Sequence, residues 1–365
     1  MILVFWQNMV SIHQSALMRA LATKHEVTLV VEQLCEQARV DSGWIIPDIG
    51  NTRIVVAPTD AEIHELLALD NDCVHIFTGM RAFPMVTKAF KQAVRRKLFV
   101  GLYMEPFDPT GWKGKIRKIV YQLLALRYRH NVSFVLATGK TGLQCYRSSG
   151  FSDLQVFEWG YFTEHPAHYK IKDARFDKTI LLFIGQLISR KSILPFIQTF
   201  KELPNSSSCE LHIIGDGVQK NELIAAIDGH SNIKYLGNVP NKEISKHLQS
   251  CDLMVLPSIH DGWGAVVNEA LQSGCRVLCS TACGAASLLD GEIRGSTFDW
   301  NTPDDLSDKL QYWVNKGKLT SNTRDNIQNW AKQNISGESA ANYLEIIVQF
   351  CKSKKLTTRP TPPWK

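Results

Sequence analysis

Residues 257–284, PSIHDGWGAVVNEALQSGCRVLCSTACG, hold the elements of a parallel α/β sheet within a short span. The apolar run that leads into them, CDLMVLPS at 251–258, is typical of a buried parallel strand. The expected elements are a strand over 251–258, a glycine-rich turn over 261–264, a helix over 265–272 and a second strand over 276–280. This order predicts one unit of a doubly wound sheet, with glycines at the turn where ligand phosphates commonly bind.

Two carboxylates bracket the expected turn and helix. The helix residues expected to share one buried face are Val266, Val267, Ala270 and Leu271. Glu269 lies about 130° from the centre of that face, where it can reach a ligand. A diphosphate at the helix N-terminus would meet backbone N–H groups and the positive end of the helix dipole. We therefore expect such a ligand here, with Asp261 near one end of it and Glu269 near the other.

The length of 365 residues predicts two domains. In the first half, strand candidates alternate with helical patterns, which indicates a parallel doubly wound sheet. The strand candidates are 2–6, 27–32, 54–57, 74–78, 98–102, 134–137 and 154–157, and the helical patterns are 11–22, 61–69, 85–97 and 113–129. The first glycine of the chain is Gly43, so the turn after the first strand lacks the fingerprint of a dinucleotide-binding loop.

We predict four segments along the chain. They are a first domain over 1–165, a linker over 166–178, a second domain over 179–338, and a C-terminal helix with an extended tail over 339–365. The linker is polar and of mixed charge, whereas the tail is too rich in proline to be helical.

Composition describes an ordinary globular protein, with 44% hydrophobic and 21% charged residues. No apolar run approaches the roughly 18 residues of a membrane span, and the opening MILVFW is expected to be a strand and not a signal peptide, so a cytoplasmic location is expected. Nine scattered cysteines do not form a disulfide pattern, and Cys275, Cys279 and Cys283 are interpreted as small buried residues and not as metal ligands.

Positive charge is concentrated in one segment. The net charge is +6, and residues 81–129 contain twelve basic residues and two acids. Helical spacing over 113–129 predicts that part of this helix packs into the domain; the apolar residues concerned are Ile116, Ile119, Val120, Leu123 and Leu124. The basic segment is interpreted as a docking surface for an anionic membrane, with a solvated basic face as the alternative. No nucleic-acid motif is present, so nucleic acid is not an expected partner.

The pattern Asp261-x7-Glu269, with glycines between, resembles the acid-x7-Glu motif of retaining GT-B glycosyltransferases of family 4, the glycosyl transferases group 1. Members of that family more often have Glu at the first position. Three segments upstream resemble further motifs of the family, in the same order and spacing: FIGQLISRKSILPFIQTF at 183–200, IIGDGVQKNELI at 213–224 and YLGNVPNKEI at 235–244.

This resemblance implies the GT-B fold, in which two Rossmann-like domains face each other across a cleft and the final helix crosses back to the first domain. It implies transfer of a hexose from a nucleotide sugar, which we expect to be UDP-linked, with retention at the anomeric carbon and without a metal or other cofactor. The expected acceptor is a saccharide, carried on a polyprenyl diphosphate, in the synthesis of bacterial O-antigen, capsule, exopolysaccharide or lipopolysaccharide. The enzyme would then work on the inner face of the cytoplasmic membrane.

The resemblance also assigns donor contacts in the second half. Lys191 corresponds to the lysine at the donor diphosphate, Asp261 to the first acid near the transferred sugar, and Glu269 to the glutamate at the ribose hydroxyls. Gln186 stands where the family has an arginine, and Arg190 is the expected substitute. The remaining expected donor contacts are Asp216, Gly237, Val239, Gly262, Trp263, Gly264, Ala265 and Val266.

Catalytic and acceptor residues are harder to assign in the first half. The family often has a histidine after the fifth strand, where this chain has Glu105; we take Glu105 as the candidate, with a loop cap as the alternative. His13 is the candidate for acceptor contact, whereas His75 lies mid-strand and is expected in the core. The DxD at residues 70–72 is interpreted as the start of a strand and not as a metal motif.

Two other functions remain open. A nucleotide-sugar 2-epimerase shares the GT-B architecture and acts without an acceptor. An inactive sugar-binding subunit is the third possibility, because Gln186 and Asp261 both depart from the family pattern.

Overall fold

The computed structural model describes residues 1–36, 46–69, 72–108, 110–165, 178–289, 292–353 and 358–365. The chain divides into two compact units. Unit 1 comprises Met1–Glu164 and Asn334–Lys365, and unit 2 comprises His165–Gln333. Almost all of the expected linker, and the first two residues of the DxD sequence, lie outside the described residues.

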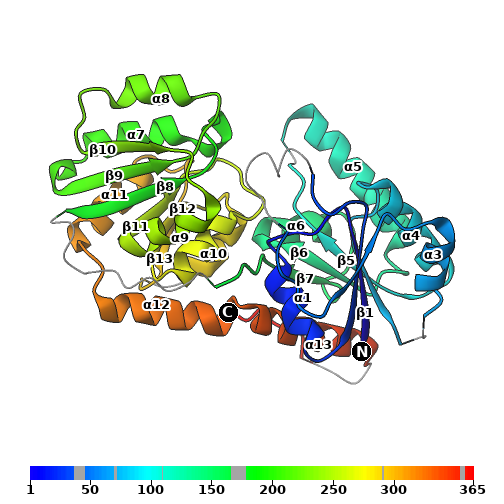
Figure 1. Ribbon diagram of the computed structural model, residues 1–365. Helices are drawn as coiled ribbons and strands as arrows, with labels where there is room; N and C mark the ends of the chain where they lie inside the picture. Colours follow the sequence, from blue (N-terminus) through cyan, green and yellow to red (C-terminus); the bar gives the residue numbers. More distant parts are fainter. Residues whose placement is uncertain (37–45, 70–71, 109, 166–177, 290–291, 354–357) are drawn as a thin grey trace. The chain divides into compact units, whose positions relative to one another are not determined.

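Unit 1 contains a seven-stranded parallel sheet in the order β3-β2-β1-β4-β5-β6-β7 (Figure 1). Its strands are β1 (Ile2–Gln7), β2 (Glu26–Val31), β3 (Arg53–Val56), β4 (Val74–Thr78), β5 (Phe99–Met104), β6 (Phe134–Thr138) and β7 (Val156–Trp159). The winding reverses between β1 and β4, so their carboxyl ends form a topological switch point, where doubly wound sheets commonly bind ligands.

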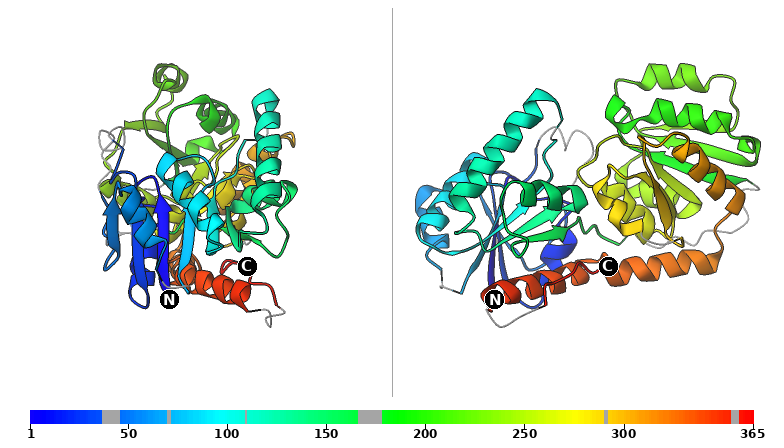
Figure 2. Two further views of the ribbon diagram at one scale, coloured as in Figure 1. Left: turned by 90° about the vertical axis from the view of Figure 1, so that its right-hand side faces the viewer. Right: turned by 180° about the vertical axis from the view of Figure 1, so that it is seen from behind.

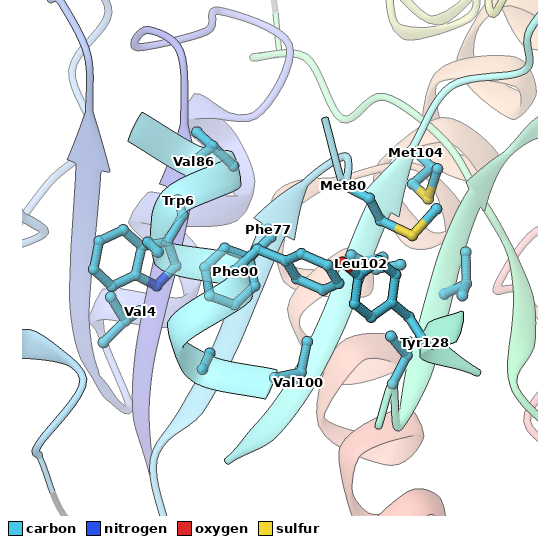
Figure 3. Packing of buried hydrophobic residues seen from close by; sticks show 14 of the residues in the cluster. Val4, Trp6, Phe77, Met80, Val86, Phe90, Val100, Leu102, Met104 and Tyr128 are labelled. Carbon is cyan, nitrogen blue, oxygen red and sulfur yellow. The ribbon is translucent and has the colours of Figure 1, made fainter. Parts of the chain in front are cut away.

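Helices cover both faces of this sheet. The described helices of unit 1 are α1 (Ser15–Ala22), α3 (Asp60–Leu66), α4 (Pro84–Arg95), α5 (Gly111–Tyr128), α6 (Gly139–Ser148) and α13 (Gly337–Lys352). The first core lies between the sheet and α3, α4, α5 and α6. In that core Trp6 stacks on Phe77, which meets the edge of Phe90 (Figure 3). On the other face α1 packs against α13, and Gly337 is needed there because a Cβ would lie 2.2 Å from the carbonyl oxygen of Ala16.

His75 belongs to the core of unit 1, as the sequence predicts. It lies in β4 and is 1% exposed, and its Nδ1 accepts a hydrogen bond of 3.3 Å from the Trp6 indole N–H. Burial lowers the pKa of His75 to about 4, so its ring stays neutral at physiological pH.

Unit 2 contains a six-stranded parallel sheet in the order β10-β9-β8-β11-β12-β13. Its strands are β8 (Thr179–Ile184), β9 (Cys209–Ile214), β10 (Ile233–Gly237), β11 (Leu253–Leu256), β12 (Arg276–Ser280) and β13 (Gly295–Phe298). Its α-helices are α7 (Ile193–Glu202), α8 (Lys220–Ile227), α9 (Asn241–Ser250), α10 (Ala265–Gln272), α11 (Asp305–Lys316) and α12 (Ser321–Asn334). One core lies between the sheet and α7, α8 and α11. The two doubly wound parallel sheets confirm the predicted fold class.

The expected burial of the three closely spaced cysteines is confirmed. All nine cysteines are free thiols, and Cys275, Cys279 and Cys283 are buried. Within the described ranges, no three His, Cys, Asp or Glu side chains gather into a group that could hold a metal ion. No helix in the described part of the chain is long and apolar enough to cross a bilayer.

The predicted buried face of α5 is only partly correct, because Leu124 packs against the core and three of the other residues do not. Ile116, Ile119 and Leu123 are 51%, 56% and 61% exposed. The side of α5 that packs into unit 1 instead carries Gly114, Tyr121, Leu124, Ala125 and Tyr128. Apolar side chains occupy two sides of this helix, and spacing alone does not indicate which side meets the sheet.

Candidate functional site

The predicted donor residues of unit 2 gather at one edge of its sheet. The chain winds from β8 through β9 to β10 and then crosses to β11 on the other side of β8, so the carboxyl ends of β8 and β11 form a switch point. Gln186 follows β8, Asp216 follows β9, Gly237 ends β10 and Asp261 follows β11. Because the strands are parallel, all four residues lie at the same edge.

The closest charged contact at this edge joins Lys191 and Asp261. The Lys191 Nζ lies 2.5 Å from the Asp261 Oδ2, and the two side chains are 14% and 13% exposed. The Arg190 guanidinium lies 3.9 Å from the same carboxylate oxygen. Two cations share one carboxylate, so this group keeps a net positive charge that suits an anion.

Backbone contacts hold the lysine segment against the loop that carries Asp261. The Ile259 N–H donates to the carbonyl oxygen of Arg190 at 3.0 Å, and the Arg190 guanidinium donates to the carbonyl oxygen of His260 at 2.9 Å. Lys191 ends a short 3₁₀ turn, Ser189–Lys191, between β8 and α7. The cation and the carboxylate therefore meet through fixed backbone, although 70 residues separate them in the sequence.

A second loop, residues 281–285, braces the glycine-rich turn, and the sequence reasoning missed it. The Gly284 N–H donates to the carbonyl oxygen of Asp261 at 3.1 Å, and the Ala285 N–H donates to that of Trp263 at 2.8 Å. A Cβ at Gly284 would lie 2.2 Å from the carbonyl oxygen of Gly262. Gly264 has φ +91°, and a Cβ there would lie 2.7 Å from the Cys283 Sγ. The small residues of TACGAAS were the available signal.

In the glycine-rich turn, the groups that remain available for the predicted donor contacts are those of the backbone. The Trp263 side chain is 1% exposed, and its indole N–H donates to the Asn268 Oδ1 at 2.7 Å. Its ring therefore holds the turn in place. The N–H groups of Ala265 and Val266 belong to the first turn of α10, where a helix leaves its donors unsatisfied, whereas the Val267 N–H donates to the carbonyl oxygen of Gly264 at 2.9 Å. These donors and the helix dipole favour an anion.

Glu269 lies in the second turn of α10 and is half-buried. Burial raises the pKa of Glu269 to about 7. Val267, Ala270 and Leu271 are fully buried as predicted, whereas Val266 is only half-buried. Glu269 is thus less solvated than the helical wheel predicts.

Asp216 belongs to a tight turn after β9. Its side chain is exposed, accepts a hydrogen bond from the Gly217 N–H at 2.8 Å and lies 3.6 Å from the Lys220 Nζ. A Cβ at Gly215 would lie 1.9 Å from the carbonyl oxygen of Gly185, and one at Gly217 would lie 2.5 Å from that of Leu187. The glycines of this motif let the loops after β8 and β9 touch.

Gly215→Ala should therefore destabilise unit 2 by clearly more than Gly229→Ala, its matched control. Both glycines have positive φ, +140° and +75°, but a Cβ at Gly229 would meet no atom within 4 Å. We expect about 1–2 kcal/mol for the control, from backbone conformation alone. Urea unfolding of the two variants measures the difference. Equal midpoints would contradict the close approach at Gly215.

A pocket in unit 1 brings together the two candidates of the first half. A cavity of about 350 Å³ is lined by His13 and Glu105. His13 stacks on Tyr161 with centroids 4.7 Å apart, and the Tyr161 hydroxyl donates to the Glu105 carboxylate. Other rings and amides that line it are Phe83, Tyr103, Tyr121, Tyr146, Gln7, Asn8 and Gln14. Tyr161 follows β7 and carried no sequence signal.

Comparison with known proteins finds a family similar to the sequence of unit 2. Residues 166–332 match the family Glycosyl transferases group 1. An N,N'-diacetylbacillosaminyl-diphospho-undecaprenol alpha-1,3-N-acetylgalactosaminyltransferase of Campylobacter jejuni is 25% identical over 178 residues, 48% of this chain and 46% of that protein. A putative teichuronic acid biosynthesis glycosyltransferase of Bacillus subtilis, TuaC, is 32% identical over 113 residues, 31% of this chain and 27% of that protein. The chain thus spans less than half the length of either relative.

The whole chain also resembles a solved structure. Anabaena Alr3699/HepE, crystallised in complex with UDP, superposes with a TM-score of 0.70 over 96% of this chain and 100% of that one, at 13% identity. At this identity the likeness shows a shared fold.

Proposed function

We propose that this chain, whose residues 166–332 match the glycosyl transferases group 1, transfers a hexose from a UDP-sugar to a saccharide acceptor with retention at the anomeric carbon. The observation that carries the proposal is the meeting of Lys191, Arg190 and Asp261 beside the N-terminus of α10 at a switch point. Related proteins named for polysaccharide biosynthesis support a role in making surface polysaccharide.

In this proposal the donor diphosphate lies between Lys191 and the first turn of α10. The lysine ammonium and the backbone N–H groups face the oxygens on which charge develops when the bond to the sugar breaks. Binding draws Lys191 partly away from Asp261, and the freed carboxylate can then accept hydrogen bonds from the transferred sugar. No metal and no covalent nucleophile is assigned to the reaction.

Gln186 and Arg190 complete the proposed phosphate contacts. The Gln186 side chain is exposed at the carboxyl end of β8, where it can donate a hydrogen bond but adds no charge. Arg190, already 3.9 Å from Asp261, supplies the second positive charge. The base of the nucleotide is assigned to the backbone at Gly237 and Val239, where Gly237 has φ +71° and open space around it.

The acceptor is assigned to the pocket of unit 1. Its aromatic rings offer flat apolar faces to a sugar, and its amides together with His13 and Glu105 offer hydrogen bonds to hydroxyls. The Campylobacter jejuni relative is named for a diphospho-undecaprenol acceptor, which supports a polyprenyl-diphosphate-linked saccharide here. Such an acceptor places the protein at the anionic inner face of the cytoplasmic membrane.

Glu269 should make donor binding depend on pH. A carboxylate that accepts hydrogen bonds from both ribose hydroxyls must be ionised, and the pKa of Glu269 is about 7. The affinity for a UDP-sugar should therefore rise about tenfold between pH 6 and pH 8 in the natural chain, and much less in Glu269→Gln. Calorimetric titration of both proteins against UDP-glucose and other UDP-sugars measures the slope.

The same carboxyl predicts the opposite trend in stability without ligand. The folded pKa lies above the unfolded value of about 4.3, so the folded chain binds the extra proton and loses stability as pH rises from about 4 to about 7. Glu269→Gln should lack this loss, on the order of 2–3 kcal/mol.

Two outcomes would contradict the account of donor binding. If the donor affinity of both proteins changed equally with pH, the assignment of Glu269 would be contradicted. If a UDP-sugar left the melting temperatures of both proteins unchanged, donor binding itself would be contradicted.

A further inference from the structure

Helix α5 of unit 1 carries a row of large apolar side chains that the domain does not cover. The row, here called the exposed stripe, consists of Trp112, Ile116, Ile119, Leu123 and Leu126, which are between 51% and 69% exposed. Spacings of four and three residues place all five within about 80° around the helix. The stripe lies opposite the packed side of α5, which includes Tyr121 and Ala125. Figures 1 and 2 show α5 extending beyond the body of unit 1.

Lys115 and Arg127 border the exposed stripe, each about 60° from its centre around the helix. They belong to a set of six basic residues on α5 or directly after it: Lys113, Lys115, Arg117, Lys118, Arg127 and Arg129. The α5 sequence contains no Asp or Glu. The Lys113 Nζ lies 5.5 Å from the centre of the Trp112 ring, so charge and apolar surface adjoin directly.

The basic helix α4 differs from α5 in this respect. Its Lys88 pairs with Asp60, and Arg96, which follows it, hydrogen-bonds to His64. Its apolar residues Val86, Ala89, Phe90 and Ala93 are buried, so no second apolar row faces solvent. Of the two basic helices in the segment 81–129, α5 is therefore the one that presents both apolar and charged side chains to solvent.

We propose that α5 docks on an anionic lipid bilayer, with the exposed stripe inserted at the level of the headgroups and the basic residues on the lipid phosphates. An apolar row with cationic borders and a tryptophan near one end is the composition of a helix that lies in a membrane interface. The long lysine and arginine stems reach the headgroups while the stripe contacts acyl chains. The inference rests on unit 1 alone and does not require the proposed glycosyl transfer.

Charge decides between a bilayer and the other partners that an apolar row could bind. A second copy of the chain, docked α5 against α5, would bring two sets of six cations together without an acid from either helix. A nucleic acid would match the cations but leave the aliphatic stripe in water. An anionic bilayer satisfies both parts of the surface.

The test is flotation of the intact protein with vesicles of phosphatidylglycerol and phosphatidylcholine, compared with vesicles of phosphatidylcholine alone. We expect binding to the anionic vesicles and at least tenfold weaker binding to the neutral ones. Because the stripe adds an apolar term that salt does not screen, binding should weaken in 0.5 M NaCl but persist. A variant with Trp112→Gln, Ile119→Gln and Leu123→Gln should lose at least tenfold in vesicle affinity at both salt concentrations.

A matched control changes three apolar side chains that are equally exposed on other elements, Leu154→Gln, Ile293→Gln and Ile346→Gln. It should bind vesicles as the natural chain does. Equal binding by the stripe variant, or no binding by the natural chain, overturns the proposal. The proposal is also overturned if the natural chain sediments as a dimer and does not bind vesicles while the stripe variant sediments as a monomer. That result would assign the stripe to self-association. Donor binding in unit 2 is measured separately, so vesicle binding can fail without affecting the proposed function.

Discussion

Lys191→Ala should lower the rate of sugar transfer about ten- to hundredfold while the chain remains folded. The lysine supplies a charged hydrogen bond to the leaving diphosphate in our mechanism, and such a bond contributes about 1.5–3 kcal/mol. The substitution also leaves Asp261 with Arg190 as its only cation within 4 Å in the described part of the chain. That carboxylate then repels the incoming diphosphate, which adds to the loss.

Lys234→Ala is the matched control for this variant. Lys234 also forms a lysine–carboxylate contact, 2.6 Å to the Glu210 Oε2, but its side chain is 45% exposed on β10. An exposed pair contributes about 0–1 kcal/mol, so transfer should change little. Nucleotide release under saturating donor, compared for the two variants, measures the effect. Equal rates of nucleotide release in the two variants would show that Lys191 takes no part in the reaction.

Removal of residues 359–365 should destabilise unit 1 by at least about 4 kcal/mol. The Lys365 Nζ lies 2.5 Å from the Glu158 Oε2, and the Glu158 side chain is only 2% exposed. Breaking a buried pair by removing one partner costs about 3–5 kcal/mol, because the other charge stays buried. Trp364 is 4% exposed and is lost in the same truncation, together with the hydrogen bond of 2.6 Å from Arg359 to the carbonyl oxygen of Val156.

The melting temperature of unit 1 should then fall by roughly 10 °C, since each kcal/mol shifts a domain of this size by about 2–4 °C. Glu158→Gln in the truncated chain should recover part of the lost stability, because it removes the buried negative charge whose cation the truncation takes away. Calorimetry distinguishes unit 1 from unit 2 if the two melt separately. This account of the tail would be contradicted if unit 1 melted at the same temperature in the truncated and the full chain. It would also be contradicted if Glu158→Gln did not raise the melting temperature of the truncated chain.

Strands were predictable from sequence because a buried parallel strand is apolar throughout. The window 74–78 coincides with β4, whereas the window 154–157 began too early because Leu154 is 62% exposed and lies in the turn before β7. Helix α6 was missed because it contains Gly139 and Gly142, which lower helix propensity. Gly142 is retained because a Cβ there would lie 3.2 Å from the backbone carbonyl carbon of Ala137, a contact that no local pattern reveals.

The two candidate sites were predictable to different degrees. The motifs of unit 2 each end a strand, so parallel pairing alone brings Lys191 and Asp261 to one edge. The contact of Tyr161 with Glu105 depends on the loop after β7 returning to the switch point of the first sheet, and sequence reasoning did not include it. Trp263 remains a predicted donor contact through its backbone, because its ring is buried and donates to Asn268.

The central claim is that the chain breaks the bond between a sugar and a nucleotide, and one measurement tests it most directly. Nuclear magnetic resonance follows UDP-glucose, UDP-galactose and UDP-N-acetylglucosamine separately with the intact protein and no acceptor, with water as the default acceptor. We predict slow release of UDP from at least one of them, with the free sugar formed first as the α anomer. Conversion of UDP-N-acetylglucosamine to an epimer without release of UDP, or tight binding of a UDP-sugar that stays intact, would contradict the claim.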